Sequence, residues 1–530
     1  MLRRVRRIVQ GTSLLLFLVL LVLTRYEGQD ELGWPVRLFL DIDPLVTITT
    51  LLSAHALPAA FLGGFLVLAL GLVVGKAFCG WICPLGAIHQ LAGRWGKRRP
   101  AHERRVRLYS PAQRWKYGML AGVLAAAALG FHAAGFLDPI SLSIRSLGLA
   151  IGPAAELALR GLFDALYHTE SESVRAVSEP LYNLFRNNVL SFEQPSFRQA
   201  DLLGLLFVGI VALNLVRPRF WCRFLCPLGA LLGVVARYGT LRLDGGECTG
   251  CNLCTLRCPA GASPEEAASG GWRPAECFVC GTCTATCEQG LAFGWARPHP
   301  LPGSPPIEGV DAGRRVVLVG AAAGIVAAPL ARLPGLDRPA PPDRIRPPGA
   351  LPEPDFLARC IRCGECMKVC LTNGLHPAGL EYGLEAAWTP ILEPRRGYCE
   401  YDCTLCGQVC PTGALRPLSV EEKREVVIGI AFVDPSRCLP LAFGTPCIVC
   451  EEHCPTEPKA IQLAALEVRL PDGEVAQVDR PVVDVDRCVG CGLCEARCPV
   501  VDLPAIRVSS IGETRDPDNR FLLSDGIYEG

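Results

Sequence analysis

The sequence predicts an all-α membrane domain of four spans at the N-terminus, then small α+β domains built around groups of cysteines, with a fifth membrane span between them. Three observations predict this architecture: long apolar stretches, a motif pair repeated within them, and 28 cysteines that mostly stand in compact groups of four. Apolar stretches of about 20 residues are long enough to cross a bilayer. Cysteines grouped so closely along a chain typically hold metal.

The composition sets the broad class. The chain has 530 residues, of which 50% are hydrophobic, so it has room for several domains. Lys and Arg number 52, as do Asp and Glu, and this balance gives no sign of nucleic acid as a partner. In a small secreted protein so many cysteines would indicate disulfides. Their regular spacing here favours metal ligation instead.

Five apolar stretches are the predicted spans. They are residues 14–23, 56–75, 117–137, 202–216 and 316–330. The first follows a cluster of arginines, as in a cleaved signal peptide, but no small-residue cleavage site follows it, which favours an anchor. The fifth is short and rich in alanine, so a buried helix of a soluble domain is its alternative.

Basic residues predict the orientation, because positively charged flanks stay in the cytoplasm. They stand after the second and fourth stretches and before the fifth: Lys97, Arg98, Arg99, Arg104, Arg105, Arg107, Arg217, Arg219, Arg223, Arg314 and Arg315. We therefore expect a multi-pass protein of the bacterial inner membrane, with a cytoplasmic N-terminus and a periplasmic C-terminal half.

The first four spans form a duplicated pair. One copy runs from Asp43 to Cys83 and the other from Asp138 to Cys226. Each copy opens with Asp-Pro and closes with C-x3-C-P, and the second carries an insertion within residues 153–197. Two parallel copies predict a pseudo-twofold axis along the membrane normal.

Six groups of four cysteines follow the second copy. They are Cys248, Cys251, Cys254 and Cys258; Cys277, Cys280, Cys283 and Cys287; Cys360, Cys363, Cys366 and Cys370; Cys399, Cys403, Cys406 and Cys410; Cys438, Cys447, Cys450 and Cys454; and Cys488, Cys491, Cys494 and Cys498. Four groups read C-x2-C-x2-C-x3-C, the run with which bacterial ferredoxins bind [4Fe-4S] clusters. Zinc is the rival ligand of four thiolates, but the repeated dicluster spacing favours iron. The fourth and fifth groups are irregular, so a longer ligand loop or an incomplete site is expected there.

In this motif the fourth cysteine binds the neighbouring cluster, so groups work in pairs. We therefore expect Cys258 to join the first three cysteines of the second group, and Cys287 those of the first. The same exchange should link groups three and four, and groups five and six. We therefore expect the six groups to bind about six [4Fe-4S] clusters. The expected domains are the four-span membrane domain (1–240), a cytoplasmic dicluster ferredoxin-like domain (241–300), a linker with the fifth span (301–350) and a periplasmic four-cluster domain (351–530).

Four cysteines lie outside these groups. Cys79 and Cys83, like Cys222 and Cys226, are four residues apart, so each pair should share one helix face. The proline after each motif should end or kink that helix. If the two copies pack about a pseudo-twofold axis, the four thiols converge, either on a further metal centre or as redox-active disulfides. Small packing residues are the alternative.

Four polar residues are candidates for a quinol site. Asp43 and Asp138 occupy matching positions and could accept protons from a quinol, although Asp-Pro also caps helices and forms turns. His55 and His132 stand near the predicted outer ends of spans, where an imidazole could bond a quinol hydroxyl. An interfacial histidine with its hydrogen bonds already satisfied is the alternative.

The motifs resemble a known family. Two C-x3-C-P motifs on a four-span core, followed by two ferredoxin groups, resemble NapH, the membrane component of the quinol dehydrogenase that serves periplasmic nitrate reductase; MauN and part of NosR look similar. From about Gly313, twin arginines, an apolar stretch and four cysteine groups resemble NapG, its exported partner. The residues around these arginines depart from a good twin-arginine signal. The chain thus resembles a NapH–NapG fusion over nearly its whole length.

The resemblance implies a function. It implies a carrier that takes electrons from the membrane quinone pool and delivers them to a periplasmic reductase or cytochrome c-type acceptor. The alternative is a maturation or regulatory factor that donates electrons to a metalloenzyme, as NosR-like and CcoG-like proteins suggest. A pair of cytosolic ferredoxin domains is a third option. The sequence holds no C-x-x-C-H haem motif, so we expect any haem on a separate partner.

Overall fold

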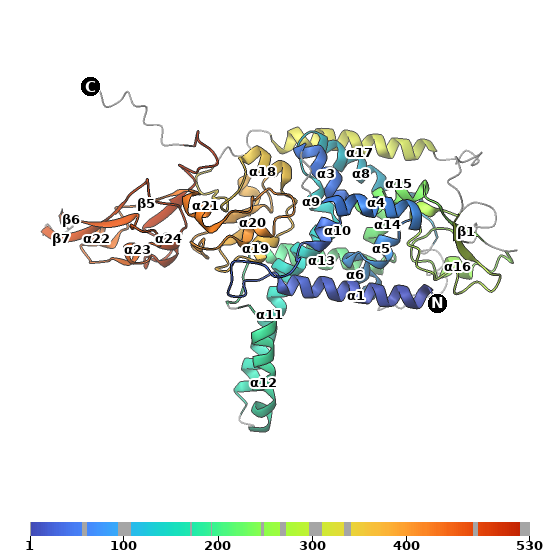
Figure 1. The fold of residues 1–530 in the computed structure, drawn as a ribbon, viewed down its shortest axis with the longest axis horizontal. Coiled ribbons are helices and arrows are strands. Elements are labelled where there is room, and N and C mark those ends of the chain that lie inside the picture. The colour runs from blue at the N-terminus through green and yellow to red at the C-terminus, as the bar shows by residue number, and fades with distance from the viewer. Residues whose placement is uncertain are drawn as a thin grey trace.

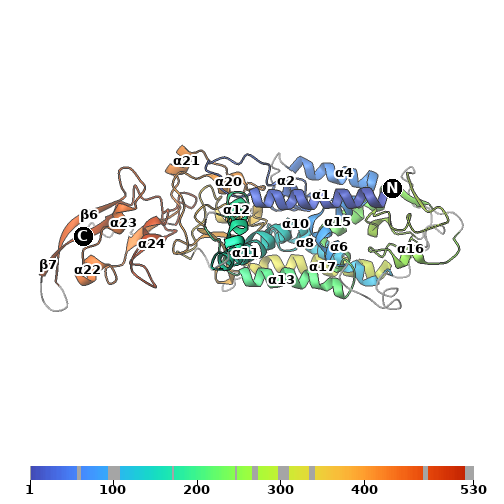
Figure 2. The same cartoon turned by 90° about the horizontal axis from the view of Figure 1, so that it is seen from below.

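The computed structural model describes residues 2–55, 61–93, 108–169, 172–191, 193–244, 248–264, 272–295, 310–332, 341–469 and 475–519. A bundle of helices occupies the middle of an elongated molecule, and a cysteine-rich part lies at each end of it (Figures 1 and 2). The helices α1 (Leu2–Leu23) and α17 (Val310–Ala331) run along the length of the bundle. The two cysteine-rich parts are therefore separated by the helical part.

Each copy of the repeat, taken together with the helices that precede its Asp-Pro and apart from the insertion, is built from an equivalent series of helices. After α1, the first copy contains α2 (Leu38–Asp41), α3 (Pro44–Ala54), α4 (Leu62–Val74), α5 (Ala77–Trp81) and α6 (Pro84–Ala92). The second contains η2 (Pro111–Arg114), α8 (Trp115–Ala128), α9 (Ala134–Leu137), α10 (Pro139–Ser146), η3 (Leu147–Ile151), α11 (Gly152–Tyr167), α12 (Glu172–Asn188), α13 (Ala200–Ala212), η4 (Leu213–Leu215), α14 (Phe220–Phe224) and α15 (Pro227–Arg237). The predicted insertion corresponds to α11 and α12, which project sideways from the bundle (Figure 1).

The two copies pack on each other in a reciprocal way. Helix α1 contacts α5 and α6, as α8 contacts α14 and α15. Across the copies, α6 contacts α10 and α13, and α15 contacts the equivalent helices α3 and α4. This exchange of equivalent contacts is the pattern that a pseudo-twofold relation produces.

Helix starts are fixed by the motifs that open and close each copy. The Asp43 carboxylate accepts hydrogen bonds from the backbone N–H groups of Leu45 (2.8 Å) and Val46 (3.2 Å), and Asp138 caps α10 in the same way. Proline at the first helical position suits both starts, because its missing N–H would be unpaired there anyway. A proline also opens α6 and α15, so Cys83 and Cys226 precede new helices instead of ending old ones.

This break corrects one expectation. Cys79 lies in α5 and Cys83 at the start of α6, so the pair does not share the face of one continuous helix. The same holds for Cys222 in α14 and Cys226 at the start of α15. The physical reason is the proline after each motif, which disfavours helical backbone at the preceding cysteine.

Three helices in the described part are long and apolar enough to cross a membrane: Leu2–Leu23, Pro139–Tyr167 and Gly313–Ala331. The first and last contain the predicted first and fifth stretches. The three stretches between them hold shorter apolar helices, α4, α8 and α13, and residues 56–60 of the second stretch lie outside the described part. The basic residues between 97 and 107 lie outside it as well. Hydropathy did not mark 139–167 as a span.

Short antiparallel strand pairs organise the cysteine-rich parts. In the first, β1 (Leu241–Asp244) pairs with β2 (Ala292–Trp295), with α16 (Leu253–Leu256) and η6 (Pro274–Glu276) between them. In the second, β3 (Leu375–Pro377) pairs with β4 (Pro390–Leu392), β5 (Ile430–Val433) with β8 (Ile506–Ser509), and β6 (Ile461–Arg469) with β7 (Val475–Val483). Its helices are α18 (Glu353–Arg359), α19 (Glu365–Lys368), η7 (Leu380–Tyr382), α20 (Leu405–Gln408), α21 (Val420–Glu425), α22 (Leu439–Phe443), α23 (Val449–Glu452) and α24 (Leu493–Arg497).

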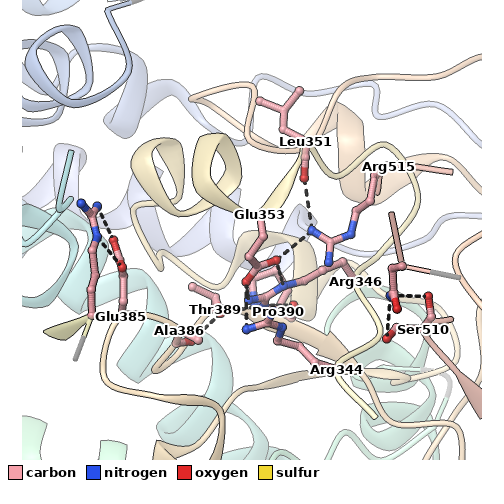
Figure 3. A network of polar contacts seen from close by, with 12 residues as sticks. Arg344, Arg346, Leu351, Glu353, Glu385, Ala386, Thr389, Pro390, Ser510 and Arg515 are labelled. Carbon is pink, nitrogen blue, oxygen red and sulfur yellow. Dashed lines mark hydrogen bonds and ion pairs between the residues drawn. The ribbon is translucent and has the colours of Figure 1, made fainter. Parts of the chain in front are cut away.

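A buried ion-pair network ties the end of the described chain to the start of α18 (Figure 3). Glu353 accepts hydrogen bonds from Arg346 (2.6 Å) and from Arg515 (2.8 Å), and Arg515 also donates to the carbonyl of Leu351 (3.3 Å). Burial alone would raise the pKa of Glu353, but the neighbouring guanidinium groups outweigh it and hold that pKa below its usual range. Since α18 leads directly to Cys360, the network fixes the first ligand loop of this part.

Candidate metal cluster sites

Three cavities in the C-terminal part are each lined by four cysteines. Three of the four come from one group and the fourth from its neighbour. The sets are Cys360, Cys363, Cys366 and Cys410; Cys370, Cys399, Cys403 and Cys406; and Cys454, Cys488, Cys491 and Cys494. These are the exchanged sets that the dicluster spacing predicts. The one-residue insertion in the fourth group is therefore accommodated in a complete four-cysteine site.

The remaining C-terminal cysteines follow the same rule. The Cys438 thiol interacts with those of Cys447 and Cys498, and Cys450 interacts with Cys438 and Cys447. The long loop between Cys438 and Cys447 holds the short helix α22, which accounts for the irregular spacing.

The N-terminal cysteine-rich part shows one exchanged set clearly. The Cys277 thiol interacts with Cys280, Cys283 and also Cys258, as the exchange requires. The other set of this part is more open: Cys248 and Cys251 are exposed, Cys254 is buried and Cys287 is half-buried. A cluster bound there would therefore lie closer to the surface than one bound by the neighbouring set.

The ligand loops of the four regular groups share one backbone conformation. The second residue after the first cysteine has positive φ in each group: Gly250 (71°), Val279 (49°), Arg362 (55°) and Gly490 (74°). So does the fourth residue, at Asn252, Gly281, Gly364 and Gly492. Such left-handed residues form nests of inward-pointing N–H groups, which recur at iron–sulfur sites. One such N–H, of Val279, donates to the sulfur of Cys277 (3.4 Å).

All 28 cysteines are free. Burial raises the pKa of Cys403, Cys450 and Cys491 to about 12 each, so these thiols are protonated at neutral pH unless a metal compensates the charge. Within the described ranges, no three Cys, His, Asp or Glu side chains converge as ligands of a single ion. Cluster ligands need no such convergence, because each thiolate binds its own iron. Iron binding by these cysteines stays a prediction.

The quinol candidates lie at different places in the bundle. Asp43 and Asp138 are both fully buried, and their carboxyl groups interact directly. Each also caps a helix, which is the alternative that the sequence left open. His132 is fully buried and bonds Thr50 Oγ1 (3.1 Å), whereas His55 is exposed at the end of α3. A role in quinol oxidation stays a prediction for all four.

Several polar residues that the sequence did not single out lie beside the cysteines. Thr372, Thr412 and Thr456 each place a hydroxyl next to the sulfur of the cysteine two positions earlier. In the bundle, Lys76 and Lys116 are fully buried and interact with the Cys79 thiol. The threonines follow a C-x-T pattern that could have been found. The buried lysines leave no such signal.

Comparison with family models finds matches to iron–sulfur domains in the helical bundle and in the C-terminal cysteine-rich part. A family described as a 4Fe-4S binding domain matches residues 56–101 and 202–243, and a second family of the same description matches residues 481–501. The first two segments contain the four C-x3-C-P cysteines and none of the six groups. The third contains the last group.

Curated relatives match about a third of the chain. It is 41% identical to the methylamine utilization ferredoxin-type protein MauM of Methylorubrum extorquens over 168 residues, which are 31% of this chain and 71% of the relative. It is 40% identical to the ferredoxin-type protein NapG of Escherichia coli over 167 residues, 31% of this chain and 70% of NapG. No solved structure matches. With its exchanged cysteine sets, the chain belongs to the family of iron–sulfur, ferredoxin-type electron-transfer proteins that includes MauM and NapG.

Proposed function

We propose that this protein is a membrane-bound quinol dehydrogenase that passes electrons from the quinone pool to a periplasmic reductase or cytochrome c-type acceptor. The observation that carries the proposal is the placement of cysteine sets at both ends of an apolar helical bundle (Figures 1 and 2). Quinols dissolve in the bilayer, so a donor site within the bundle and an acceptor site at one end suit this arrangement.

Both cysteine-rich parts touch the bundle backbone. A Cβ atom at Gly80 would collide with the carbonyl oxygen of Phe278, between Cys277 and Cys280 of the N-terminal cysteine-rich part. We call the ligands of that part the inner set and those of the C-terminal part the outer set. At the other end, a Cβ at Gly135 would collide with the carbonyl of Ile361, between Cys360 and Cys363. No side chain separates the ligand loops from the bundle at these contacts. The clusters supply one-electron chemistry when bound, and the chain supplies this spacing.

Quinol oxidation also releases protons. Two carboxyl groups buried against each other do not both ionise readily, so the pair of Asp43 and Asp138 is suited to hold a proton and pass it on. His132 lies close to the outer ligand loop, because its carbonyl accepts a hydrogen bond from Arg362 (2.7 Å). Its Nδ1 atom makes no hydrogen bond to another residue in the described part and is available to a quinol hydroxyl.

Quinol-driven cluster reduction tests the proposal. Anaerobic protein in lipid nanodiscs is mixed with a reduced benzoquinol, and the bleaching of its visible absorbance is followed. We expect reduction in seconds or less and, with the double variant Asp43→Asn/Asp138→Asn, a slower rate at unchanged iron content. Asn keeps an oxygen that can cap each helix but cannot take up the proton.

The second candidate function gives a different result. A maturation factor transfers electrons once for each enzyme it activates and is dispensable afterwards. A relay sustains quinol oxidation for as long as an external acceptor such as ferricyanide or a cytochrome c is supplied. Clusters that dithionite reduces but no quinol reduces would exclude the quinol dehydrogenase role.

A further inference from the structure

We propose that Cys79, Cys83, Cys222 and Cys226 together bind one further four-iron cluster inside the helical bundle, between the two sets of cluster sites. Its role as a link between the two ends rests on the proposed electron relay. Its existence does not, and it can be tested separately.

The four thiols lie near enough to interact with one another, at matching positions of the two repeats. Their exposed fractions are only 3–6%. The Cys79 thiol interacts with that of Cys222, Cys83 interacts with both, and Cys226 interacts with all three others. The reciprocal packing of the two copies thus closes a four-thiol set from two C-x3-C-P motifs that are more than a hundred residues apart in the sequence.

The positive charges around these four thiols favour a negatively charged group at the site. Lys76 and Lys116 are fully buried, Arg219 is 2% exposed, and all three interact with the Cys79 thiol. Glu276 forms an ion pair with Lys116. The ammonium group of Lys76 makes no hydrogen bond in the described part of the chain.

Burying a cation without an anionic partner is strongly destabilising. Four thiolates around a four-iron cluster carry net negative charge and would balance these cations. Since Glu276 already pairs with Lys116, four neutral thiols, or two disulfides, would leave Lys76 and Arg219 without an anionic partner in the described part of the chain. The charge pattern therefore favours a cluster over small packing residues and over redox-active disulfides.

As in one of the other ligand loops, a backbone N–H points at a cysteine sulfur here. The Gly229 N–H donates to the sulfur of Cys226 (3.2 Å). A Cβ at Gly229 would lie 3.4 Å from Lys76 Nζ and 3.5 Å from the Cys226 sulfur, so the ammonium and the thiol flank the same small space. In the first copy the Gly86 backbone N–H lies near the Cys83 thiol at the equivalent position, although it forms no cap hydrogen bond there. The match of both segments to a 4Fe-4S binding domain agrees with this geometry.

The site also adjoins both ends of the bundle. Lys76 and Arg219 lie over the ring of Phe278, 5.2 and 4.7 Å from its centroid, next to the inner ligand Cys277. Trp81 donates to the carbonyl of Val279 (3.0 Å) in the same inner loop.

On the other side, Cys83 interacts with Asp138, and Asp138 with Arg145. Arg145 donates to the carbonyl of Arg362 (2.8 Å), between the outer ligands Cys360 and Cys363. A cluster at the four thiols would therefore occupy the gap between the inner and outer sets.

Counting iron and acid-labile sulfide in the anaerobically purified wild-type chain tests the site without any mutation. Seven clusters give about 28 iron atoms per chain and six give about 24. In addition, Cys79→Ser/Cys222→Ser should lose about four irons, whereas Ser146→Ala, also buried in the bundle, should lose none. An iron count near 24 in the wild type, or a mapped Cys79–Cys83 disulfide, would overturn the proposal.

A variant that removes one buried positive charge tests the site through a reduction potential, which would stay unchanged if the lysine had only a structural role. Lys76→Met should keep the full iron content and lower the reduction potential of one cluster, because a nearby positive charge stabilises the more negative reduced state. Arg175→Met on the exposed α12 should leave every potential unchanged. Unchanged potentials in Lys76→Met would contradict a cluster at the thiols. Protein with about 28 irons that no quinol reduces would keep this site and remove the proposed function.

Discussion

At the residue scale, hydroxyl groups next to ligand sulfurs are positioned to tune the clusters. The Thr456 hydroxyl lies 3.3 Å from the Cys454 sulfur and accepts a hydrogen bond from the N–H of Ala460 (2.8 Å), so its own proton is free to point at the sulfur. The Thr372 hydroxyl instead donates to the carbonyl of Tyr398. Hydrogen bonds to ligand sulfurs are one of the factors that set cluster potentials.

Thr456→Val should therefore lower the potential of the cluster that Cys454 helps to bind. Losing a bond that favours the reduced state by about 0.5–1.5 kcal/mol corresponds to about 20–60 mV for one electron. Redox titration followed by electron paramagnetic resonance measures the shift. Thr372→Val is the matched control, and a shift of equal size there would show that the sulfur contact is not responsible.

Because of His376 on β3, the stability of the folded C-terminal part depends on pH. It is fully buried, and burial, with smaller contributions from Arg396 and Arg198, lowers the pKa of His376 to about 4. A group whose pKa is depressed on folding contributes stability that is present above its unfolded pKa, about 6.5, and lost as the pH falls toward the folded value. The full loss is about 3 kcal/mol for a shift of this size.

We expect the thermal midpoint of wild-type protein to fall between pH 7 and pH 5 by several degrees more than that of His376→Phe, whose phenyl ring is flat and aromatic like imidazole but does not titrate. Circular dichroism at each pH measures both midpoints. Parallel pH profiles of the two proteins would show that His376 is not buried in its neutral form.

The sequence predicted some of the functional residues and missed others. Ligand spacing predicted the exchanged cysteine sets, because the ligand loops are local and short. It missed Lys76, Lys116 and Arg219, since a cation in an apolar chain normally marks a membrane boundary and Arg219 was interpreted in that way. Their burial depends on how the two copies pack, which no local pattern records.

At the element scale, α8 and α17 pack through glycines. A Cβ at Gly320 would collide with the carbonyl of Gly118, and a Cβ at Gly324 with that of Gly122. Two small-x3-small motifs thus allow the backbones to touch, as in membrane helix pairs. The residue numbers increase together along the contact, so the two helices run parallel.

Gly320→Ile should push α17 away from α8, because its side chain needs the space that the Gly118 carbonyl occupies. The two backbones would have to move apart, and the other contacts between the helices would then be lost. Gly209→Ile is the control: it lies in the apolar helix α13 with nothing within 4 Å of an added Cβ. We expect a loss of several degrees in thermal midpoint for the first variant only. Equal behaviour of the two variants would contradict close packing of α8 against α17.

Hydropathy located the apolar stretches but not the residues at which the helices within them end. The predicted span 117–137 is divided by Gly130, whose φ of 79° ends α8 before α9 begins. The stretch 56–75 ends at Gly75 (φ 64°), and the preceding helix α3 ends at His55 (φ 49°). An average over a window of residues does not register such turns. The two-residue motifs Asp-Pro and Cys-Pro predicted the helix starts correctly, because capping is local.

At the scale of the whole molecule, the bundle separates the two cysteine-rich parts along the direction of α1 and α17 (Figure 1). The parallel course of α8 and α17 agrees with a topology in which the third and fifth apolar stretches cross the membrane in the same direction. The repeat could be recognised in the sequence, whereas the sideways projection of α11 and α12 could not, because it depends on how the inserted helices leave the packed core.

This topology predicts that the two cysteine-rich parts face opposite sides of the membrane. A recognition site for a specific protease is inserted after Gln289 in one variant and after Glu425 in another, both at exposed positions. Protease added to spheroplasts should cut only at Glu425, and in inverted vesicles only at Gln289, because the intact bilayer shields the other site. Detergent should expose both sites and so serves as the control for accessibility. Cleavage of both variants from the same side would mean that the bundle does not separate two compartments, and the C-terminal cysteine sets could then not donate electrons to a periplasmic acceptor.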